Sequence, residues 1–184
     1  MLRFETPRLI GIAATPALAR ADAGDAAAFS RLLAARIPGS WPIEVMADVR
    51  EHFAHQLETG AMTPGWAMWY LLAPRAEPPR RLIGVVGFYG RPDADGTATL
   101  GYGIAPEDEG QGFATEAVAG LMAWGRAHGG VAAFAATTFE LHHASVRVLQ
   151  KNGFACVGVS PDDAEAPDSD RQGRGRLMVW RRLA

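Results

Sequence analysis

A short glycine-rich segment has the residue types that could bind an anion through its backbone. Gly110 and Gly112 follow an acidic turn and precede a helix expected at residues 114–128. Glycine adopts backbone conformations that a Cβ resists, and it lets a ligand approach the main chain closely. The first turn of a helix carries unpaired N–H groups and the positive end of the helix dipole. The segment therefore predicts a cradle for a phosphate or pyrophosphate that needs no lysine or arginine.

The same segment excludes two common nucleotide-binding motifs. It lacks the Gly-Lys-Ser/Thr ending of a P-loop. No strand–helix–strand unit begins the chain, as the dinucleotide fingerprint requires. For the segment taken alone, a glycine-rich turn before an ordinary capped helix is the alternative interpretation.

A second informative segment, residues 137–154, lies one predicted strand further along the chain and contains Ser145 near the start of a short helix. In a β–α–β arrangement, both helices begin at the carboxyl ends of neighbouring strands. Open α/β sheets bind their ligands at that edge. We therefore expect Ser145 and the glycine-rich turn to face the same region.

Hydrophobic patterning predicts the elements that position these two segments. Strands are expected at residues 8–14, as an edge strand, and at 66–73, 82–89, 97–104, 131–139, 154–160 and 176–183. Helices are expected at residues 26–37, with Asp25 as the N-cap, and at 45–58, 114–128 and 144–152. A strand meander followed by β–α–β crossovers predicts one α/β domain over residues 1–184, with a mixed sheet. We interpret residues 161–175 as a polar loop inside a hairpin.

The composition is that of an ordinary globular domain. The chain has 184 residues, 48% of them hydrophobic, and a net charge of −2. This balance excludes a broadly basic nucleic-acid binder, which needs an excess of Lys and Arg. Cys156 is the one cysteine, which excludes an intramolecular disulfide and a cysteine-based zinc cluster. We see no signal peptide or membrane-spanning run, so we expect a cytoplasmic protein that contacts no membrane.

The chain resembles the GNAT superfamily of acyl-CoA-dependent N-acetyltransferases, and within it the RimJ/RimL-like branch. Gly101-Tyr102, the turn at residues 110–117 and the helix segment at 144–154 carry the resemblance, which is densest over residues 82–158. Thr6-Pro7-Arg8-Leu9 is similar to the opening strand of that branch. The resemblance implies a mixed, mostly antiparallel sheet of about seven strands, with helices on both faces and a splayed central strand pair.

The resemblance also implies acetyl-CoA as the co-substrate. Its pantetheine arm would pair with backbone near Ile104 and Ala105, and its pyrophosphate would lie on the cradle. An amine would attack the thioester directly, with a backbone donor from residues 103–105 stabilising the oxyanion. Ser145 is implied as the proton donor to the CoA sulfur, with helix capping as its alternative. The implied cofactor-binding residues are Ile104, Ala105, Gly110, Gln111, Gly112, Phe113, Ala114, Thr115, His142 and Ser145.

Three positions near the motifs depart from the family's pattern. Glu109 stands where Arg or Gln is usual, and because a carboxylate repels a pyrophosphate we expect it to face away. His142 stands where Asn is frequent, and it is a candidate either for a contact with pantetheine or for a helix N-cap. Leu149 stands where a tyrosine often protonates the departing thiolate, which excludes that donor here.

The general base is not assigned by the sequence. Thr99 stands where a glutamate often serves as the base, and threonine cannot accept a proton near neutral pH. Glu140, His142 and His143 are candidates by their place in the chain. A water chain, or an amine that arrives already neutral, is the alternative.

A few other side chains have both a functional and a structural interpretation. Trp41 is a candidate for the acceptor side, or for the core. Arg147 and Lys151 are candidates for CoA contacts, or for an exposed helix face. Glu116 is expected to cap its own helix. Nothing in the sequence indicates a metal site.

Two functions follow, from different classes. The first is an acetyl-CoA-dependent N-acetyltransferase acting on an amine, either a small molecule or a protein N-terminus. The second is a non-catalytic module that binds acyl-CoA with the same fold, which the replacements at Thr99, Glu109 and His142 would allow. The sequence names neither the acceptor nor the oligomeric state, and a homodimer is left open.

Overall fold

The computed structural model describes residues 1–73, 80–165 and 173–184. Its strands are β1 (Arg3–Glu5), β2 (Ile10–Ala13), β3 (Met68–Ala73), β4 (Arg81–Phe88), β5 (Thr97–Ile104), β6 (Ala133–Phe139), β7 (Ala155–Val159) and β8 (Leu177–Leu183). They form an eight-stranded sheet in the order β1-β2-β3-β4-β5-β6-β8-β7. The pair β5–β6 is parallel, and the other neighbouring pairs are antiparallel.

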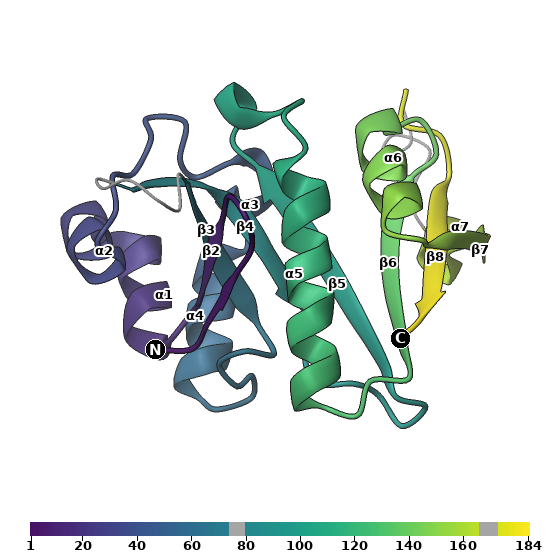
Figure 1. Cartoon of the computed structure of the whole chain (residues 1–184), viewed down its shortest axis with the longest axis horizontal. Helices are drawn as coiled ribbons and strands as arrows, with labels where there is room; N and C mark the ends of the chain where they lie inside the picture. The colour runs from purple at the N-terminus through teal and green to yellow at the C-terminus, as the bar shows by residue number, and fades with distance from the viewer. Residues whose placement is uncertain (74–79, 166–172) are drawn as a thin grey trace.

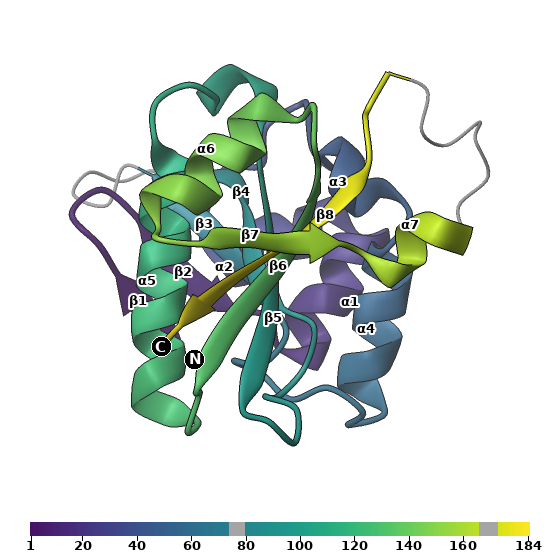
Figure 2. The same cartoon turned by 90° about the vertical axis from the view of Figure 1, so that its right-hand side faces the viewer.

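Helices cover both faces of this sheet. They are α1 (Pro16–Gly24), α2 (Ala26–Leu33), α3 (Glu44–Ala47), α4 (Arg50–Glu58), α5 (Phe113–His128), α6 (His143–Lys151) and α7 (Pro161–Glu165), with a short 3₁₀ turn η1 (Pro106–Asp108). Figure 1 shows α5 lying across β4 and β5, and Figure 2 shows α1 and α4 on the opposite side of the sheet from α5.

The alternation of side chains along β3 explains why both faces need a cover. All six of its residues are buried. Successive side chains of a strand point to opposite faces, so Trp69 and Leu71 belong to the core under α5, whereas Tyr70 and Leu72 belong to the core under α1–α4. The central strands are therefore apolar on both sides, and the two helix layers enclose them.

The structure confirms the fold expected from the sequence and corrects several elements. The strand near residues 8–14 was expected at the edge, but β2 pairs with β1 on one side and β3 on the other, so that prediction is wrong. Helix α1 was not expected, and α7 lies inside the expected loop. The helix expected at residues 45–58 is two helices, α3 and α4.

Local backbone geometry accounts for two of these differences. Asp25 ends α1 and also caps α2, because its side chain accepts the N–H of Ala28. Helix α2 ends at Leu33, earlier than expected, because Ala34 takes the left-handed conformation with φ of 52°. Left-handed backbone at a residue with a Cβ terminates a helix.

Candidate functional site

The central feature of the site is the point where β5 and β6 separate. Their parallel pairing consists of Thr97 with Ala133, Ala98 with Phe134 and Thr99 with Ala135. Beyond Thr99, β5 continues to Ile104 paired only with β4, while β6 continues to Phe139 paired with β8. Figure 1 shows the two strands diverging from this point. The expected splayed strand pair is therefore present.

The divergence leaves one edge of β5 without a strand partner among the described residues. The Thr99 carbonyl accepts the N–H of Tyr89 at 3.0 Å, and the Ala105 N–H donates to the Ile83 carbonyl at 2.8 Å, so both point toward β4. Backbone groups of successive strand residues alternate between the two edges. Leu100, Tyr102 and Ile104 therefore direct their N–H and C=O groups toward the diverging side, where an extended ligand can add as a strand.

The structure distinguishes Ala105 from Ile104, its neighbour among the expected pantetheine contacts. The N–H of Ala105 donates to the Ile83 carbonyl, and the carbonyl of Ala105 accepts the Asp108 N–H at 2.8 Å. Its side chain is fully buried. Ile104 is thus the residue of the pair whose backbone groups face the open edge.

The glycine-rich turn has the backbone geometry that an anion cradle needs. Gly110 and Gly112 have φ of 72° and 82°, in the left-handed region that favours glycine. Gly112 is the N-cap of α5, and the first helical bond runs from the Glu116 N–H to the Gly112 carbonyl. The N–H groups of the preceding helix residues, Phe113 to Thr115, therefore have no partner within the helix. Gln111 and Gly112 are exposed, as is Glu109.

An arginine from the other end of the chain lies against this turn. The Arg8 guanidinium donates from Nη1 to the Gln111 carbonyl at 3.0 Å and lies 4.5 Å from the centre of the Phe113 ring. Its Nε donates to Glu116 at 2.6 Å. The cradle therefore has a cation beside it after all, although the backbone donors do not depend on it. Sequence reasoning missed Arg8, because 103 residues separate it from Gln111.

Glu116 fastens the N-terminal segment to α5. Its carboxylate accepts the Thr6 hydroxyl at 2.6 Å and the Arg8 backbone N–H at 2.8 Å. No side chain caps the start of α5, so the prediction that Glu116 caps its own helix is wrong. Partial burial raises the pKa of Glu116, but the hydrogen bonds from Thr6 and Arg8 outweigh this and hold it below its usual value.

The turn between β5 and the cradle is anchored by a bidentate ion pair. Arg81 on β4 donates from both terminal nitrogens to the two carboxylate oxygens of Asp108, whose side chain is 5% exposed. Such forked pairs fix orientation as well as distance. The pair therefore fixes the chain between the open edge of β5 and the N-terminus of α5.

Ser145 lies across the divergence from β5, where its hydroxyl meets Tyr102. The Tyr102 hydroxyl donates to the Ser145 carbonyl at 3.0 Å, and the two hydroxyl oxygens lie 2.9 Å apart. A tyrosine hydroxyl has one hydrogen, so the Ser145 hydroxyl is the donor in the second bond. Burial raises the pKa of Tyr102 to about 12, although its bond to Ser145 opposes the rise. Tyr102 belongs to the Gly101-Tyr102 pair that carries the family resemblance, but no role for it was predicted.

The candidate bases lie at the end of β6 and the start of α6. His142 is the N-cap of α6 but makes no side-chain capping bond, and His142 and His143 are both exposed. Glu140 is also exposed, and it forms an ion pair with Arg176 at 3.9 Å. Thr99 is exposed on β5. The geometry does not single out one of these groups, so the assignment of the base stays open.

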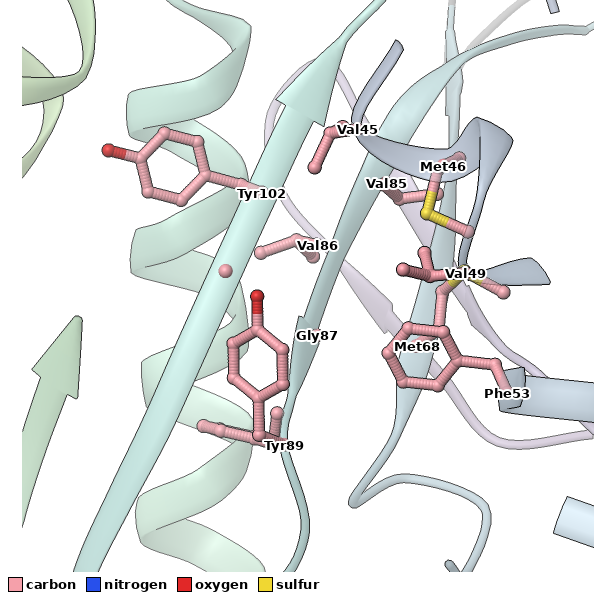
Figure 3. A pocket seen from close by; sticks show the side chains of 12 residues that line it. Val45, Met46, Val49, Phe53, Met68, Val85, Val86, Gly87, Tyr89 and Tyr102 are labelled. Carbon is pink, nitrogen blue, oxygen red and sulfur yellow. The ribbon is translucent and has the colours of Figure 1, made fainter. Parts of the chain in front are cut away.

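A cavity of about 170 Å³ lies on the face of β4 and β5 that α3 and α4 cover. Residues 45–53, which span α3 and α4, contribute Val45, Met46, Val49 and Phe53, and the sheet side contributes Met68, Val85, Val86, Gly87, Phe88, Tyr89, Gly101 and Tyr102. Figure 3 shows Val45, Met46, Val49 and Phe53 on one side of β5 and the Tyr102 ring on the other side. The cavity therefore adjoins the strand with the open edge, on the face away from Ser145.

Trp41 supports this region without lining the cavity. Its indole N–H donates to Asp22 at 2.6 Å, and the Tyr70 hydroxyl donates to the other carboxylate oxygen at 2.9 Å. Burial raises the pKa of Asp22, although these bonds and Arg50 oppose the rise. Trp41 also packs against the Phe29 ring. These contacts favour the structural interpretation of Trp41.

The remaining candidates are distributed over the surface. Arg147 and Lys151 are exposed on α6. In residues 1–73, 80–165 and 173–184, no three His, Cys, Asp or Glu side chains are grouped so that they could hold a metal ion. Over the same residues, no helix combines the length and apolar character needed to cross a bilayer.

Comparison with known proteins agrees with this geometry. The profile of the acetyltransferase (GNAT) domain family matches residues 16–155. A curated relative, the uncharacterized N-acetyltransferase YoaA of Bacillus subtilis (strain 168), is 35% identical over 80 residues. That match spans 44% of this chain and 45% of the relative, so it covers less than half of either protein.

Solved structures share the fold over almost the whole chain. The RimL ribosomal L7/L12 alpha-N-protein acetyltransferase in complex with coenzyme A has a TM-score of 0.62 and 19% identity, covering 97% of this chain and 95% of that one. The microcin C7 self-immunity acetyltransferase MccE in complex with acetyl-CoA and AMP has a TM-score of 0.62 and 14% identity, covering 97% and 94%. At these identities the likeness concerns the fold.

Proposed function

Given that this chain belongs to the acetyltransferase (GNAT) family, we propose that it transfers the acetyl group of acetyl-CoA to the α-amino group of a peptide or amino-acid derivative. The observation that carries the proposal is the open edge of β5 beside the N-terminus of α5. The family and fold predicted from the sequence are confirmed. They support the enzyme over the non-catalytic acyl-CoA-binding module.

The described geometry supports separate binding sites for the pantetheine arm and the pyrophosphate of acetyl-CoA. The pantetheine arm adds to the backbone edge of Leu100, Tyr102 and Ile104. The pyrophosphate accepts the N–H groups of residues 111–115, and Gly110 and Gly112 allow its close approach. We propose contacts with acetyl-CoA for Ile104, Gln111, Phe113, Ala114, Thr115, His142 and Ser145, as expected from the sequence, and a strand-positioning role for Ala105.

The chemical step is a direct transfer. The lone pair of a neutral amine attacks the thioester carbonyl carbon, and the C–S bond breaks as the tetrahedral intermediate collapses. The Ile104 N–H is the proposed oxyanion donor, a role commonly worth about 3 kcal/mol. The Ser145 hydroxyl, placed by Tyr102, turns its one hydrogen from the Tyr102 oxygen to the departing sulfur and supplies its proton, and Ser145 then regains a proton from water. The proton that the amine nitrogen loses passes to water or to a base near the end of β6.

Two observations favour an α-amine as the acceptor. Among the described residues that line the cavity, none is a carboxylate or histidine that could deprotonate an ammonium group. An α-amino group has a pKa of about 7.8 and is about half neutral at pH 8, whereas a lysine amine is less than about 1% neutral. The structural neighbour RimL is also an alpha-N-protein acetyltransferase. A cytoplasmic location and a homodimer stay predictions from the sequence.

Thiol release from acetyl-CoA, followed across a panel of amines, tests the proposal. We expect acceptor-dependent release, with peptide α-amines better than lysine-type amines near pH 8. Ser145→Ala should lower kcat by about 100-fold or more, and Ser145→Thr, which retains a hydroxyl, should keep most of the activity. Release that depends on no amine in the panel would contradict the proposal.

A further inference from the structure

We propose that the cavity beside β5 receives an apolar side chain next to the acceptor amine, so that the preferred acceptor begins with an aliphatic or aromatic residue. The inference rests on the proposed function and specifies its acceptor. It is carried by the chemistry, the size and the position of the cavity.

The chemistry of the walls selects an uncharged group. Val45, Met46 and Phe53 face Met68 and Val85 across the cavity, and no lining residue among those the structure describes carries a charge. Burying a cation or carboxylate without a partner is costly. Polyamines and other acceptors with several cationic groups are therefore disfavoured, because their further charges would meet an apolar wall.

The size of the cavity limits that group to one side chain. Its volume of about 170 Å³ is close to that of an engineered cavity of about 150 Å³, also lined by aliphatic and aromatic side chains, that binds benzene. A leucine, methionine or phenylalanine side chain has about four to seven heavy atoms and fits such a volume. A methyl group would leave most of it empty.

The cavity lies against β5, the strand whose open edge is proposed to hold the thioester. Gly101 and Tyr102 form the β5 wall, and other elements approach this strand closely at its glycines. A Cβ on Gly101 would lie 2.8 Å from the Tyr89 hydroxyl oxygen, and one on Gly103 would lie 2.6 Å from Val45. The cavity is thus separated from the open edge of β5 by the thickness of one backbone. The nitrogen of an α-amine is bonded directly to the carbon that carries the side chain. An acceptor whose side chain occupies the cavity can therefore bring its amine to the open edge of β5.

A series of amino-acid amides tests this directly on the unmodified protein. Each methylene buried from water contributes enough to change kcat/KM about fourfold. We therefore expect leucinamide to exceed alaninamide by about 50-fold in kcat/KM, mainly through KM, because the cavity binds substrate and transition state alike. Equal kcat/KM for glycinamide, alaninamide and leucinamide would overturn the inference.

A second experiment introduces a charge at the rim of the cavity. Val45 is 53% exposed on α3, so Val45→Asp tests the wall with little risk to folding. We expect it to lower kcat/KM for leucinamide at least tenfold more than that for glycinamide. The matched control is Leu32→Asp, because Leu32 is 48% exposed on α2 and is not among the lining residues. Equal losses for both acceptors in Val45→Asp would contradict the assignment.

A binding measurement separates this inference from the proposed function. Calorimetry of N-acetyl-leucinamide against N-acetyl-glycinamide, with CoA present, reports on the cavity without turnover. This measurement needs no variant, so it does not depend on whether a variant folds. Tighter binding of N-acetyl-leucinamide supports the inference, and equal binding of the two products overturns it. Absence of thiol release with every amine would instead count against the proposed function.

Discussion

Removing one hydroxyl group, by Tyr102→Phe, tests whether Tyr102 positions Ser145 for catalysis. The substitution keeps the ring and deletes the group that donates to the Ser145 carbonyl at 3.0 Å and lies 2.9 Å from its hydroxyl oxygen. Tyr102 is a positioning residue in this account, because it acts on the sulfur through Ser145. Loss of its hydroxyl frees Ser145 to point away from the sulfur.

The expected magnitude follows from two hydrogen bonds. Each contributes about 0.5–1.5 kcal/mol net, so the free energy of unfolding should fall by about 1–3 kcal/mol. The part of this that orients the Ser145 hydroxyl, about 1–2 kcal/mol, corresponds to a 5- to 30-fold fall in kcat. KM for acetyl-CoA should change little, because the cradle and the open edge of β5 are untouched.

The pH dependence gives a second readout. With a pKa of about 12, Tyr102 stays protonated in any neutral assay, so the loss in kcat should be the same from about pH 7 to 9. An unfolded tyrosine titrates near about pH 10. The unfolded state therefore loses this proton first, and stability falls as the pH rises from about 10 to 12. Tyr102→Phe should lack that part of the alkaline loss.

A double-mutant cycle with Ser145→Ala decides the mechanism. In the Ser145→Ala background, Tyr102→Phe should change kcat less than twofold, because the hydroxyl on which it acts is gone. It should still lower the free energy of unfolding by about 1 kcal/mol, because the bond to the backbone carbonyl at position 145 persists. The same fold-loss of kcat in both backgrounds would refute the argument that Tyr102 acts through Ser145.

Three further substitutions test the parts that hold acetyl-CoA. Gly112→Ala forces a Cβ into left-handed backbone at φ of 82°, so it should cost about 1–2 kcal/mol and weaken CoA binding in calorimetry. Glu116→Gln removes a carboxylate whose pKa is held below its usual value. That stability is present above about pH 4.5 and is lost as the pH falls through the lowered pKa, so the variant's acid unfolding curve should be flatter below pH 4.5. Arg81→Met leaves Asp108 buried without its partner and should lower the free energy of unfolding by about 3 kcal/mol in denaturant titrations.

The parts of the site that could be predicted from the sequence are those that depend on local geometry. Gly110 and Gly112 need left-handed backbone, and an apolar stripe on the following helix marks α5. Short-range rules of this kind apply within one turn and one helix. They located the glycine turn and the strand that leads into it without knowledge of the rest of the fold.

The contacts that could not be predicted join residues far apart in the chain. Arg8 reaches Gln111 only because the turn between β1 and β2 lies against α5, and Tyr102 reaches Ser145 only because β5 diverges from β6 beyond Thr99. Sequence spacing carries no information about such pairs. The role of Glu116 was mistaken for the same reason, because its partners come from the N-terminal segment rather than from its own helix.

The elements missed at the N-terminus had weak signals. Strand β1 has three residues, too few for an alternation to be visible. Helix α1 is rich in alanine, so its apolar face gives little contrast, although Thr15 and Pro16 form the N-cap and first-turn pair typical of a helix start. That pair was the signal that would have found it.

Hydrogen exchange with and without CoA tests the central claim most directly. CoA should bind with measurable heat and slow exchange of the amides of Gln111 to Thr115 by about tenfold or more. Pantetheine, which lacks the pyrophosphate, should protect the Ile104 amide but not that turn. Absence of heat with CoA, or binding that leaves the turn's exchange unchanged, would contradict the account.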